Sequence, residues 1–232
     1  METRQIQAIA YIENDFKQKF GIPRQSGRAN SVMSKIVFYT QYKDLDAFRG
    51  LEQFSHLWLI FDFSLSHTNT FTPLVRPPRL GGNKKVGVFA SRSPFRPNSL
   101  GLSSVKIEQI VLDQKDSPYI IVSGADLMDK TPIFDIKPYI PQADCHPDAK
   151  GSYSDSEWSH KLNIEFSDDL KRNIPTDKLQ GLIECLQDDP RPSYQNDDRV
   201  YGMSYGDYNV NFIVKDDIVL VEDIQKVNNP NK

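Results

Sequence analysis

The chain has 232 residues, of which 38% are hydrophobic and 25% are charged, as in an ordinary globular protein with one large domain or a main domain and a small companion. No apolar run approaches the roughly 20 residues of a membrane helix, and we expect no signal peptide at the N-terminus. The formal net charge is -3, and the isoelectric point near 5.8 argues mildly against a general nucleic-acid binder. Two widely spaced cysteines, Cys145 and Cys185, indicate a reduced, cytoplasmic protein.

The first part of the chain predicts short strands joined by loops. Alternating apolar residues predict a half-buried strand over 5–13, and IVFYT predicts a second strand over 36–40. Glycine, proline and serine predict a loop over 21–31. A short helix is expected after Asp44, which is suited to cap it. The continuous apolar run SHLWLIFDF predicts a central strand over 55–63 that is buried on both faces.

A basic segment rich in proline and glycine follows at 71–101. No acidic residue stands between Asp62 and Glu108, whereas the same interval contains Arg76, Arg79, Lys84, Lys85, Arg92, Arg96 and Lys106. The prolines and glycines exclude long helices, and only VGVFA at 86–90 predicts a short buried strand. Stiff, positively charged loops are suited to bind phosphates, although a solvated pair of surface loops is the alternative.

The chain up to residue 160 remains rich in predicted strands. A hairpin is expected over 100–112 and 119–127, followed by a short strand within 128–141. We therefore expect a mainly β N-terminal domain, residues 1–160, whose sheet is closed or strongly curved like a barrel. The polar, turn-rich segment 142–157 predicts a connector at its end.

The composition changes after this connector, and acidic residues outnumber basic ones. Ser167 is predicted to cap a short helix and Thr176 a longer one. The longer helix carries an apolar stripe of Leu179, Leu182, Ile183 and Leu186. Alternation over 209–215 and 218–223 predicts a hairpin. Residues 161–232 are therefore expected to form a small α+β domain.

Several familiar site signatures are absent. The chain has neither GxGxxG nor GxxxxGK[ST], and its first part lacks the alternating strands and helices of a Rossmann-type methyltransferase. The histidines and cysteines show no zinc spacing, so we expect no metal, and GxSxG is missing. The residues alone indicate a β-rich protein with a phosphate-binding surface.

A family resemblance extends this interpretation. The motifs PRQSG, RGLEQFSHLWLIF, RPPRLGGN, GVFASRSPFRPNSLG, DKTPIFDIKPY and DPRPSY occur in the same order as in the TsaA-like (YaeB- or TrmO-type) family, which the chain resembles from about residue 5 to about residue 222. The resemblance implies an S-adenosylmethionine-dependent tRNA methyltransferase with a non-Rossmann fold. It implies methyl transfer to N6 of threonylcarbamoyladenosine at position 37, beside the anticodon. It also implies a homodimer whose cofactor site lies at the subunit contact.

The resemblance carries a set of cofactor contacts onto this chain. These residues are Gln25, Ser26, Gly27, Arg28, His67, Thr68, Arg92, Leu102, Asp129, Lys130, Thr131 and Pro132. Close relatives tend to have glycine where this chain has Lys130. If the turn needs a positive φ there, the lysine costs on the order of 1 kcal/mol, and we expect function to survive because only the backbone would touch the cofactor.

The substrate would contact the basic segment. An anticodon loop presents phosphates and splayed bases, which basic and aromatic side chains recognise. The expected tRNA contacts are Arg76, Arg79, Lys84, Lys85, Phe95, Arg96, Asn98, Arg191 and Tyr194. Phe95, between two prolines, could equally be a plug in the core.

No catalytic base is identified by the sequence. Collinear placement of nitrogen and sulfonium supplies much of the acceleration of a methyl transfer. Asp135 and Tyr139 are weak candidates for a base, and a reaction without a protein base is an equal alternative. Asp135 is better explained as a structural carboxylate paired with Lys137 or a backbone amide.

Two rival functions stay open. A non-catalytic RNA-binding barrel would bind RNA without S-adenosylmethionine. An enzyme with the same fold and cofactor but a different methyl acceptor would bind S-adenosylmethionine and leave threonylcarbamoylated tRNA unmodified.

Overall fold

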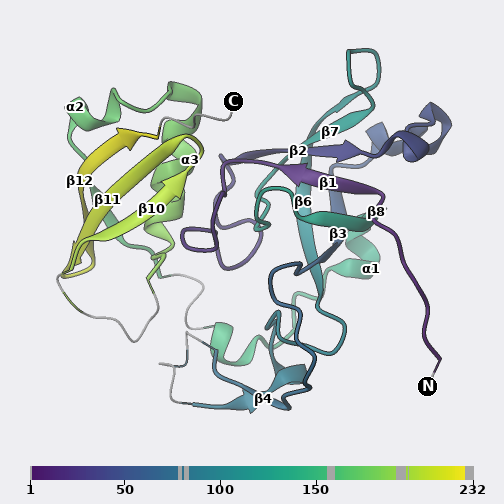
Figure 1. The fold of residues 1–232 in the computed structure, drawn as a ribbon, viewed down its shortest axis with the longest axis horizontal. Coiled ribbons are helices and arrows are strands. Elements are labelled where there is room, and N and C mark those ends of the chain that lie inside the picture. The colour runs from purple at the N-terminus through teal and green to yellow at the C-terminus, as the bar shows by residue number, and fades with distance from the viewer. Residues whose placement is uncertain are drawn as a thin grey trace.

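The computed structural model describes residues 2–77, 80, 84–155, 160–191, 197 and 199–227. Most of its regular structure is β, as predicted. A closed barrel and a four-stranded sheet lie side by side, and a small two-stranded sheet extends beyond one end of the barrel (Figure 1). Among the described residues, no helix has the length and apolar character needed to cross a membrane.

Six strands close the barrel in the order β1-β2-β7-β6-β3-β8, with antiparallel pairing throughout. The strands are β1 (Ala10–Glu13), β2 (Met33–Phe38), β3 (His56–Asp62), β6 (Leu100–Val111), β7 (Tyr119–Ser123) and β8 (Pro132–Pro138). Pairing of β1 with β8 closes the ring and removes the exposed sheet edges. The prediction of a closed, barrel-like sheet is confirmed.

Alternation along the strands fills the barrel with side chains. On β3, Leu57, Leu59 and Phe61 point into the core, whereas the residues between them are half-buried. The prediction that this strand is buried on both faces is therefore wrong, because one face of a barrel strand points outward. Gly101 lies opposite Phe61, and a Cβ there would stand 2.2 Å from the ring. The large ring on β3 thus requires a glycine on β6.

Several shorter elements differ from expectation. Only the end of the predicted strand 5–13 pairs, as β1, and the strand predicted at 36–40 spans 33–38 as β2. Asp44 does cap a helix, since its carboxylate accepts from the Asp46 amide. That helix is the 3-10 turn η2 (Leu45–Phe48), flanked by η1 (Thr40–Tyr42) and η3 (Leu51–Gln53).

The predicted strand 86–90 is mostly not a strand. Only β5 (Val86–Gly87) pairs, with β4 (Leu74–Val75), before the chain turns into η5 (Val88–Ala90). The partner strand β4 is only two residues long, so it offers no further strand pairing that would keep residues 88–90 extended. Val88 is buried, but Phe89 is 75% exposed.

The C-terminal module has a sheet in the order β10-β11-β12-β9. Its strands are β9 (Asn163–Glu165), β10 (Tyr201–Tyr205), β11 (Tyr208–Lys215) and β12 (Ile218–Lys226), and its helices are α2 (Asp168–Lys171) and α3 (Thr176–Gln187). The hairpin β11–β12 and both helices were predicted, whereas β9 and β10 were not. Ser167 caps α2 as expected, but Pro175 rather than Thr176 stands at the N-cap of α3.

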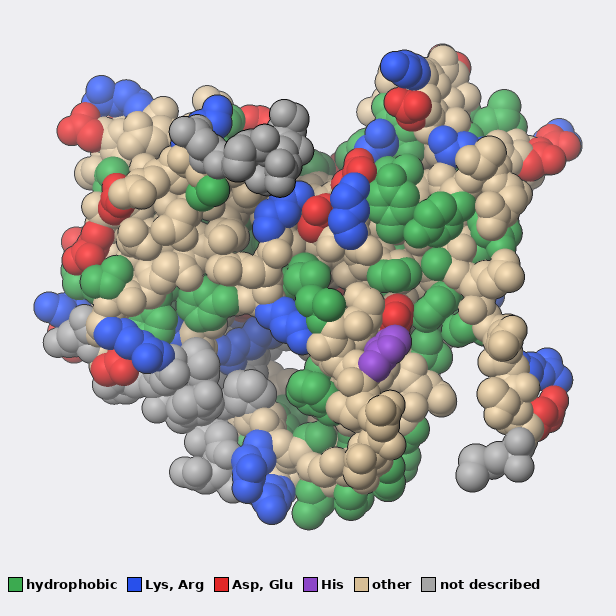
Figure 2. All heavy atoms as spheres, viewed as in Figure 1, with side chains coloured by type: hydrophobic (Ala, Val, Ile, Leu, Met, Phe, Trp, Pro, Cys, Tyr) green, Lys and Arg blue, Asp and Glu red, His purple; other side chains and the backbone are tan. Residues whose placement is uncertain are grey.

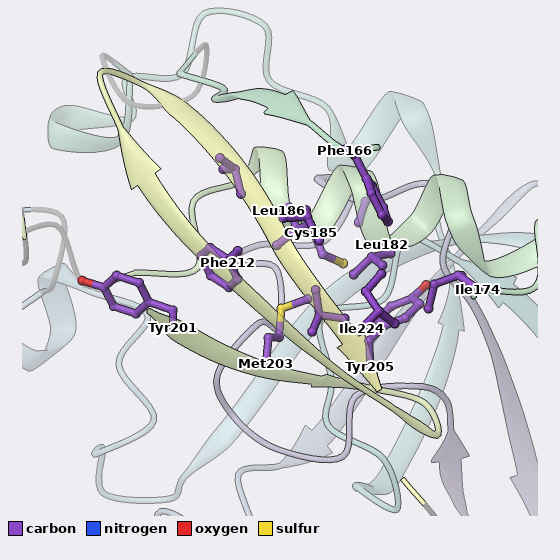
Figure 3. Packing of buried hydrophobic residues seen from close by; sticks show 14 of the residues in the cluster. Phe166, Ile174, Leu182, Cys185, Leu186, Tyr201, Met203, Tyr205, Phe212 and Ile224 are labelled. Atoms are coloured by element: carbon purple, nitrogen blue, oxygen red, sulfur yellow. The ribbon is translucent and has the colours of Figure 1, made fainter. Parts of the chain in front are cut away.

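Helix α3 packs its apolar stripe on this sheet. Figure 3 shows Leu182, Cys185 and Leu186 of the helix near Met203, Phe212 and Ile224 of the strands. The same cluster includes Phe16, Ala29 and Val32, which precede β2. At Gly181 a Cβ would lie 2.9 Å from Val32. The helix and the N-terminal loop are therefore in close contact, and both lie between the barrel and the four-stranded sheet. The segment predicted as a connector holds α1 (Pro141–Asp144) and η6 (Ser152–Ser154).

Candidate active site

A cleft of about 790 Å³ opens where loops of the barrel meet the C-terminal module. Its walls come from segments 19–25, 68–77 and 91–95, together with Tyr153 and Pro190. Lys19, Arg24, Arg76 and Arg92 line it, and none of its described lining residues is acidic. The cleft therefore presents a positive field suited to phosphates and carboxylates.

Three of the predicted cofactor residues meet in this cleft. Gln25, Thr68 and Arg92 come from three different loops. The Arg92 Nη1 donates to the Gln25 Oε1 over 2.5 Å, and the Gln25 amide donates to the Arg24 carbonyl over 2.6 Å. Arg92 remains exposed. Its guanidinium is thus oriented by Gln25 while still able to hold a carboxylate bidentately.

A second cavity, of about 270 Å³, adjoins the cleft. Lys19, Ile22, Pro94 and Phe95 line both spaces. Phe95 is 50% exposed, so it is not a plug in the core and its ring is open to a ligand. Thr131, another predicted cofactor residue, lines the small cavity together with Asp62, Phe63 and Asp126.

The DKTP turn lies between this small cavity and a third one. The Asp129 carboxylate accepts from the Asn14 amide over 2.9 Å and pairs with Lys17 over 2.8 Å. Lys130 has φ +64°, so the turn does need a left-handed residue at this position. Asp129 and Lys130 face a cavity of about 550 Å³, whereas Thr131 faces the small one. The structure therefore does not bring all the predicted cofactor residues into one pocket.

The rest of the PRQSGR loop is anchored to the barrel and the C-terminal module. The Gly27 amide donates to the Gly124 carbonyl over 2.9 Å. Arg28 is buried: its Nε pairs with Asp188 over 2.5 Å, and its Nη2 donates to the His160 carbonyl over 3.0 Å. The Arg28 guanidinium therefore joins the loop to the end of α3 and is not among the residues that line the cleft.

Three other predicted cofactor residues lie around the barrel. His67 shares a hydrogen bond of 2.6 Å with Asp62 at the end of β3. Leu102 is 55% exposed on β6, opposite Ile60. Pro132 begins β8 beside Tyr11.

The predicted tRNA contacts divide into exposed and enclosed residues. Arg76 lines the cleft, and Lys84, Lys85 and Asn98 are exposed. Arg96 is half-buried and donates to the Ser91 and Ser93 carbonyls, so it supports its own loop.

The structure does not support Arg191 as an exposed tRNA contact, because its side chain is buried and pairs with Asp189 over 2.9 Å. A buried, paired guanidinium is unsuited to be an exposed phosphate contact. Arg79 and Tyr194 lie outside the described residues.

The two weak candidates for a base lie away from the cavities. Asp135 on β8 pairs with Lys137 over 2.9 Å, the contact that the structural alternative expects. Tyr139 packs near the Trp58 ring, whose Nε1 donates to Asp144 over 2.8 Å. Neither Asp135 nor Tyr139 lines any of the three cavities. In the described part of the chain, no cluster of histidine, cysteine and acidic residues has the geometry of a metal site.

Sequence reasoning missed Asp126. The Ser103 hydroxyl donates to its Oδ1 over 2.6 Å, and the carboxylate lines the small cavity. Burial raises the pKa of Asp126, and the hydrogen bond from Ser103 opposes this effect. No motif marks this aspartate, because its surroundings come from β6 and from two distant loops.

Comparison with known proteins adds to this geometry. Residues 11–145 match the family described as the tRNA-methyltransferase O N-terminal domain, and residues 159–227 match the TrmO C-terminal domain. The chain belongs to the tRNA-methyltransferase O family. The resemblance predicted from its motifs is therefore confirmed.

Individual relatives agree with this assignment. The tRNA (adenine(37)-N6)-methyltransferase of Escherichia coli is 39% identical over 225 residues, which cover 93% of this chain and 95% of that protein. A Pseudomonas aeruginosa protein described as a putative S-adenosylmethionine-dependent methyltransferase, RcsF, is 36% identical over 96% of this chain and 98% of its own length. A crystal structure of TrmO from P. aeruginosa superimposes with a TM-score of 0.80 at 31% identity, covering 97% of this chain and 98% of the other.

Proposed function

We propose that this protein transfers a methyl group from S-adenosylmethionine to N6 of threonylcarbamoyladenosine at position 37 of tRNA. The observation that carries the proposal is family membership over nearly the whole chain, through both the N-terminal and the C-terminal domain models. This family, together with the names of its bacterial and mammalian members, supports an S-adenosylmethionine-dependent enzyme that methylates N6 of adenine 37 in tRNA. The proposed requirement for a threonylcarbamoyl group on this adenine rests on the resemblance of the motifs to the family.

The cofactor would bind around Arg92. S-adenosylmethionine carries a carboxylate, an adenine and a sulfonium cation, which need a cationic partner, backbone groups and electron-rich neighbours respectively. Arg92, held by Gln25, is suited to the carboxylate. The Ser26–Gly27 backbone, Thr68 and the turn 129–132 lie on the loops around the cleft and its neighbouring cavities. The chemistry of these residues fits the group.

The tRNA would approach the basic side of the cleft. Arg76 faces the cleft, while Lys84 and Lys85 are exposed on the chain that leads into β5. Because phosphate contacts dominate affinity for nucleic acids, exposed cations beside the cleft can hold the anticodon loop against it. The half-exposed Phe95 ring offers a stacking surface for a base.

Exposed apolar side chains at the same end of the molecule support the proposal of a homodimer. Phe71, Leu74, Phe89 and Leu102 are each about half exposed or more, and the rings of Phe71 and Phe89 stack 6.4 Å apart. Figure 2 shows hydrophobic side chains gathered around the β4 end of the molecule, close to basic ones. Exposed apolar clusters of this kind mark interfaces. A second subunit here would cover these residues and border the cleft.

Two further predictions belong to this proposal. We divide the chain at residue 160 into a catalytic barrel domain, residues 1–160, and an accessory C-terminal domain, residues 161–232. A tRNA substrate also agrees with the expected cytoplasmic location.

The experiment is a methyl-transfer assay with two acceptors. Purified protein and labelled S-adenosylmethionine are incubated with tRNA that carries, or lacks, the threonylcarbamoyl group. We expect label only in the modified tRNA. RNA binding without cofactor binding would support the non-catalytic barrel, and cofactor binding without label in either tRNA would support a different acceptor.

A further inference from the structure

A partly buried carboxylate lies where four segments of the site meet. Asp126 follows β7, and its Oδ1 accepts from Ser103 of β6 over 2.6 Å. The backbone of Ser26 and the positive charge of Arg92 both act on this carboxylate and lower its pKa. Asp126 therefore lies beside the PRQSGR loop and the arginine proposed to hold the cofactor.

Asp126 also faces open space. It lines the 270 Å³ cavity, which shares Lys19, Ile22, Pro94 and Phe95 with the large cleft. A base flipped out of an anticodon loop and placed against Phe95 would lie at the border between the two spaces. A carboxylate at this border is in a position to meet the exocyclic nitrogen of such a base.

The other charged groups here have different partners. Asp62 lines the same cavity but shares a 2.6 Å hydrogen bond with His67. Lys19 donates to the Leu65 carbonyl over 3.0 Å and to the Ser66 hydroxyl over 3.1 Å. Asp129 faces the third cavity and pairs with Lys17. Asp126 accepts from the neutral Ser103 hydroxyl and lies near an arginine, so it is the described carboxylate best placed to accept a proton.

We propose that Asp126 accepts the proton that the acceptor nitrogen loses during methyl transfer. This inference rests on the proposed function. The N6 lone pair attacks the methyl carbon, and the carbon–sulfur bond pair stays on sulfur, which becomes a neutral thioether. The N6–H bond becomes acidic as the new bond forms, and its proton passes to the Asp126 carboxylate and then to solvent.

The environment of Asp126 agrees with this role. Burial raises its pKa, which makes the carboxylate a stronger base than an exposed aspartate. The hydrogen bond from Ser103 lowers the same pKa and so opposes part of the effect of burial. Protonation of Asp126 in acid would remove the base, so the rate of methyl transfer should fall as the pH falls through this pKa. The charged groups that share the site are Arg92, Lys19 and the His67–Asp62 pair.

The test compares Asp126→Asn with Glu108→Gln. Glu108 is a matched control, because its carboxylate accepts from Ser123 over 2.6 Å on the barrel and it lines none of the three cavities. Single-turnover rates on threonylcarbamoylated tRNA and S-adenosylmethionine affinities are measured for both variants. We expect Asp126→Asn to lose about 100-fold or more in rate, the usual contribution of a general base, while keeping its cofactor affinity and losing the acid limb of the pH profile.

A second variant keeps the charge and changes only its stabilisation. Ser103→Ala removes a hydrogen bond that lowers the pKa of Asp126, so the acid limb should move to higher pH. This shift tests the proposal even if Asp126→Asn fails to fold. An acid limb that does not move, or that moves to lower pH, would overturn it.

Other outcomes separate the alternatives. A rate for Asp126→Asn equal to that of Glu108→Gln would overturn the proposal. A loss confined to cofactor affinity would overturn it too and make Asp126 a partner of the sulfonium. Wild-type activity is measured first, and its absence would refute the proposed function itself rather than the role of Asp126.

Discussion

Arg28 and Asp188 form a buried ion pair, 2.5 Å long, between the PRQSGR loop and the end of helix α3. Their side chains are only 3% and 4% exposed. The loop proposed to touch the cofactor is therefore anchored to the C-terminal module by a charge pair without access to water. This ion pair joins the stability of the fold to the position of the site.

Loss of one partner of this pair should be costly. Arg28→Ala removes the cation that neutralises the buried Asp188 carboxylate, and we expect a loss of about 3–5 kcal/mol in the free energy of unfolding. Arg49→Ala is the control, because the Arg49–Asp46 pair is 80% and 78% exposed and should contribute below about 1 kcal/mol. Urea denaturation measures both variants. Equal losses in the two would contradict a stabilising role for the buried pair.

Lys130 tests the backbone of the DKTP turn. Lys130→Gly and Lys130→Ala both remove the ion pair with Glu13, but only glycine adopts φ +64° without strain. We expect the alanine variant to be less stable than the glycine variant by about 1 kcal/mol. Thermal unfolding at equal concentrations gives the difference. An alanine variant as stable as the glycine variant would show that the turn is not left-handed at this position.

Arg92 tests the placement of the cofactor. Arg92→Ala removes an exposed guanidinium that donates a hydrogen bond to Gln25, so the fold should not change. Loss of a charged hydrogen bond to the cofactor carboxylate should weaken S-adenosylmethionine binding by at least about 10-fold. Calorimetry gives the affinity and circular dichroism checks the fold. A folded variant with wild-type affinity would remove Arg92 from the site.

Lys84 and Lys85 test the tRNA surface. The double variant Lys84→Ala, Lys85→Ala should bind tRNA more weakly, and the slope of log affinity against log salt should flatten by about 0.7–0.9 for each phosphate that is no longer neutralised. Lys215→Ala, an exposed lysine at the end of β11, is the control and should keep the slope. Filter binding across a salt series measures this. An unchanged slope in the double variant would place the tRNA elsewhere.

The sequence predicted elements whose pattern is local. Strand β6, the hairpin β11–β12 and helix α3 each carry a periodicity that depends only on neighbouring residues. Strand β10 was missed although Tyr201, Met203 and Tyr205 alternate with small residues, because the run has only five residues and includes a glycine, which is a poor strand former. Its pairing with β11 keeps it extended. Closure of the barrel depends on Ala10 pairing with Ile133, and no local pattern contains such a pairing.

The site was predicted in part for the same reason. Family motifs brought Gln25 and Arg92 into the candidate set, and the structure places them in contact. The burial of Arg191 and the position of Asp126 depend on how distant segments pack. A charged residue in a loop sequence does not show whether it faces solvent, a partner or a cavity.

The most direct test of the central claim is the mass of the nucleoside at position 37 after incubation with S-adenosylmethionine. We predict that threonylcarbamoyladenosine gains one methyl group at N6, and that unmodified adenosine in the same tRNA gains none. Methylation of unmodified adenosine alone, or no methylation of either tRNA by protein that binds S-adenosylmethionine, would contradict the account.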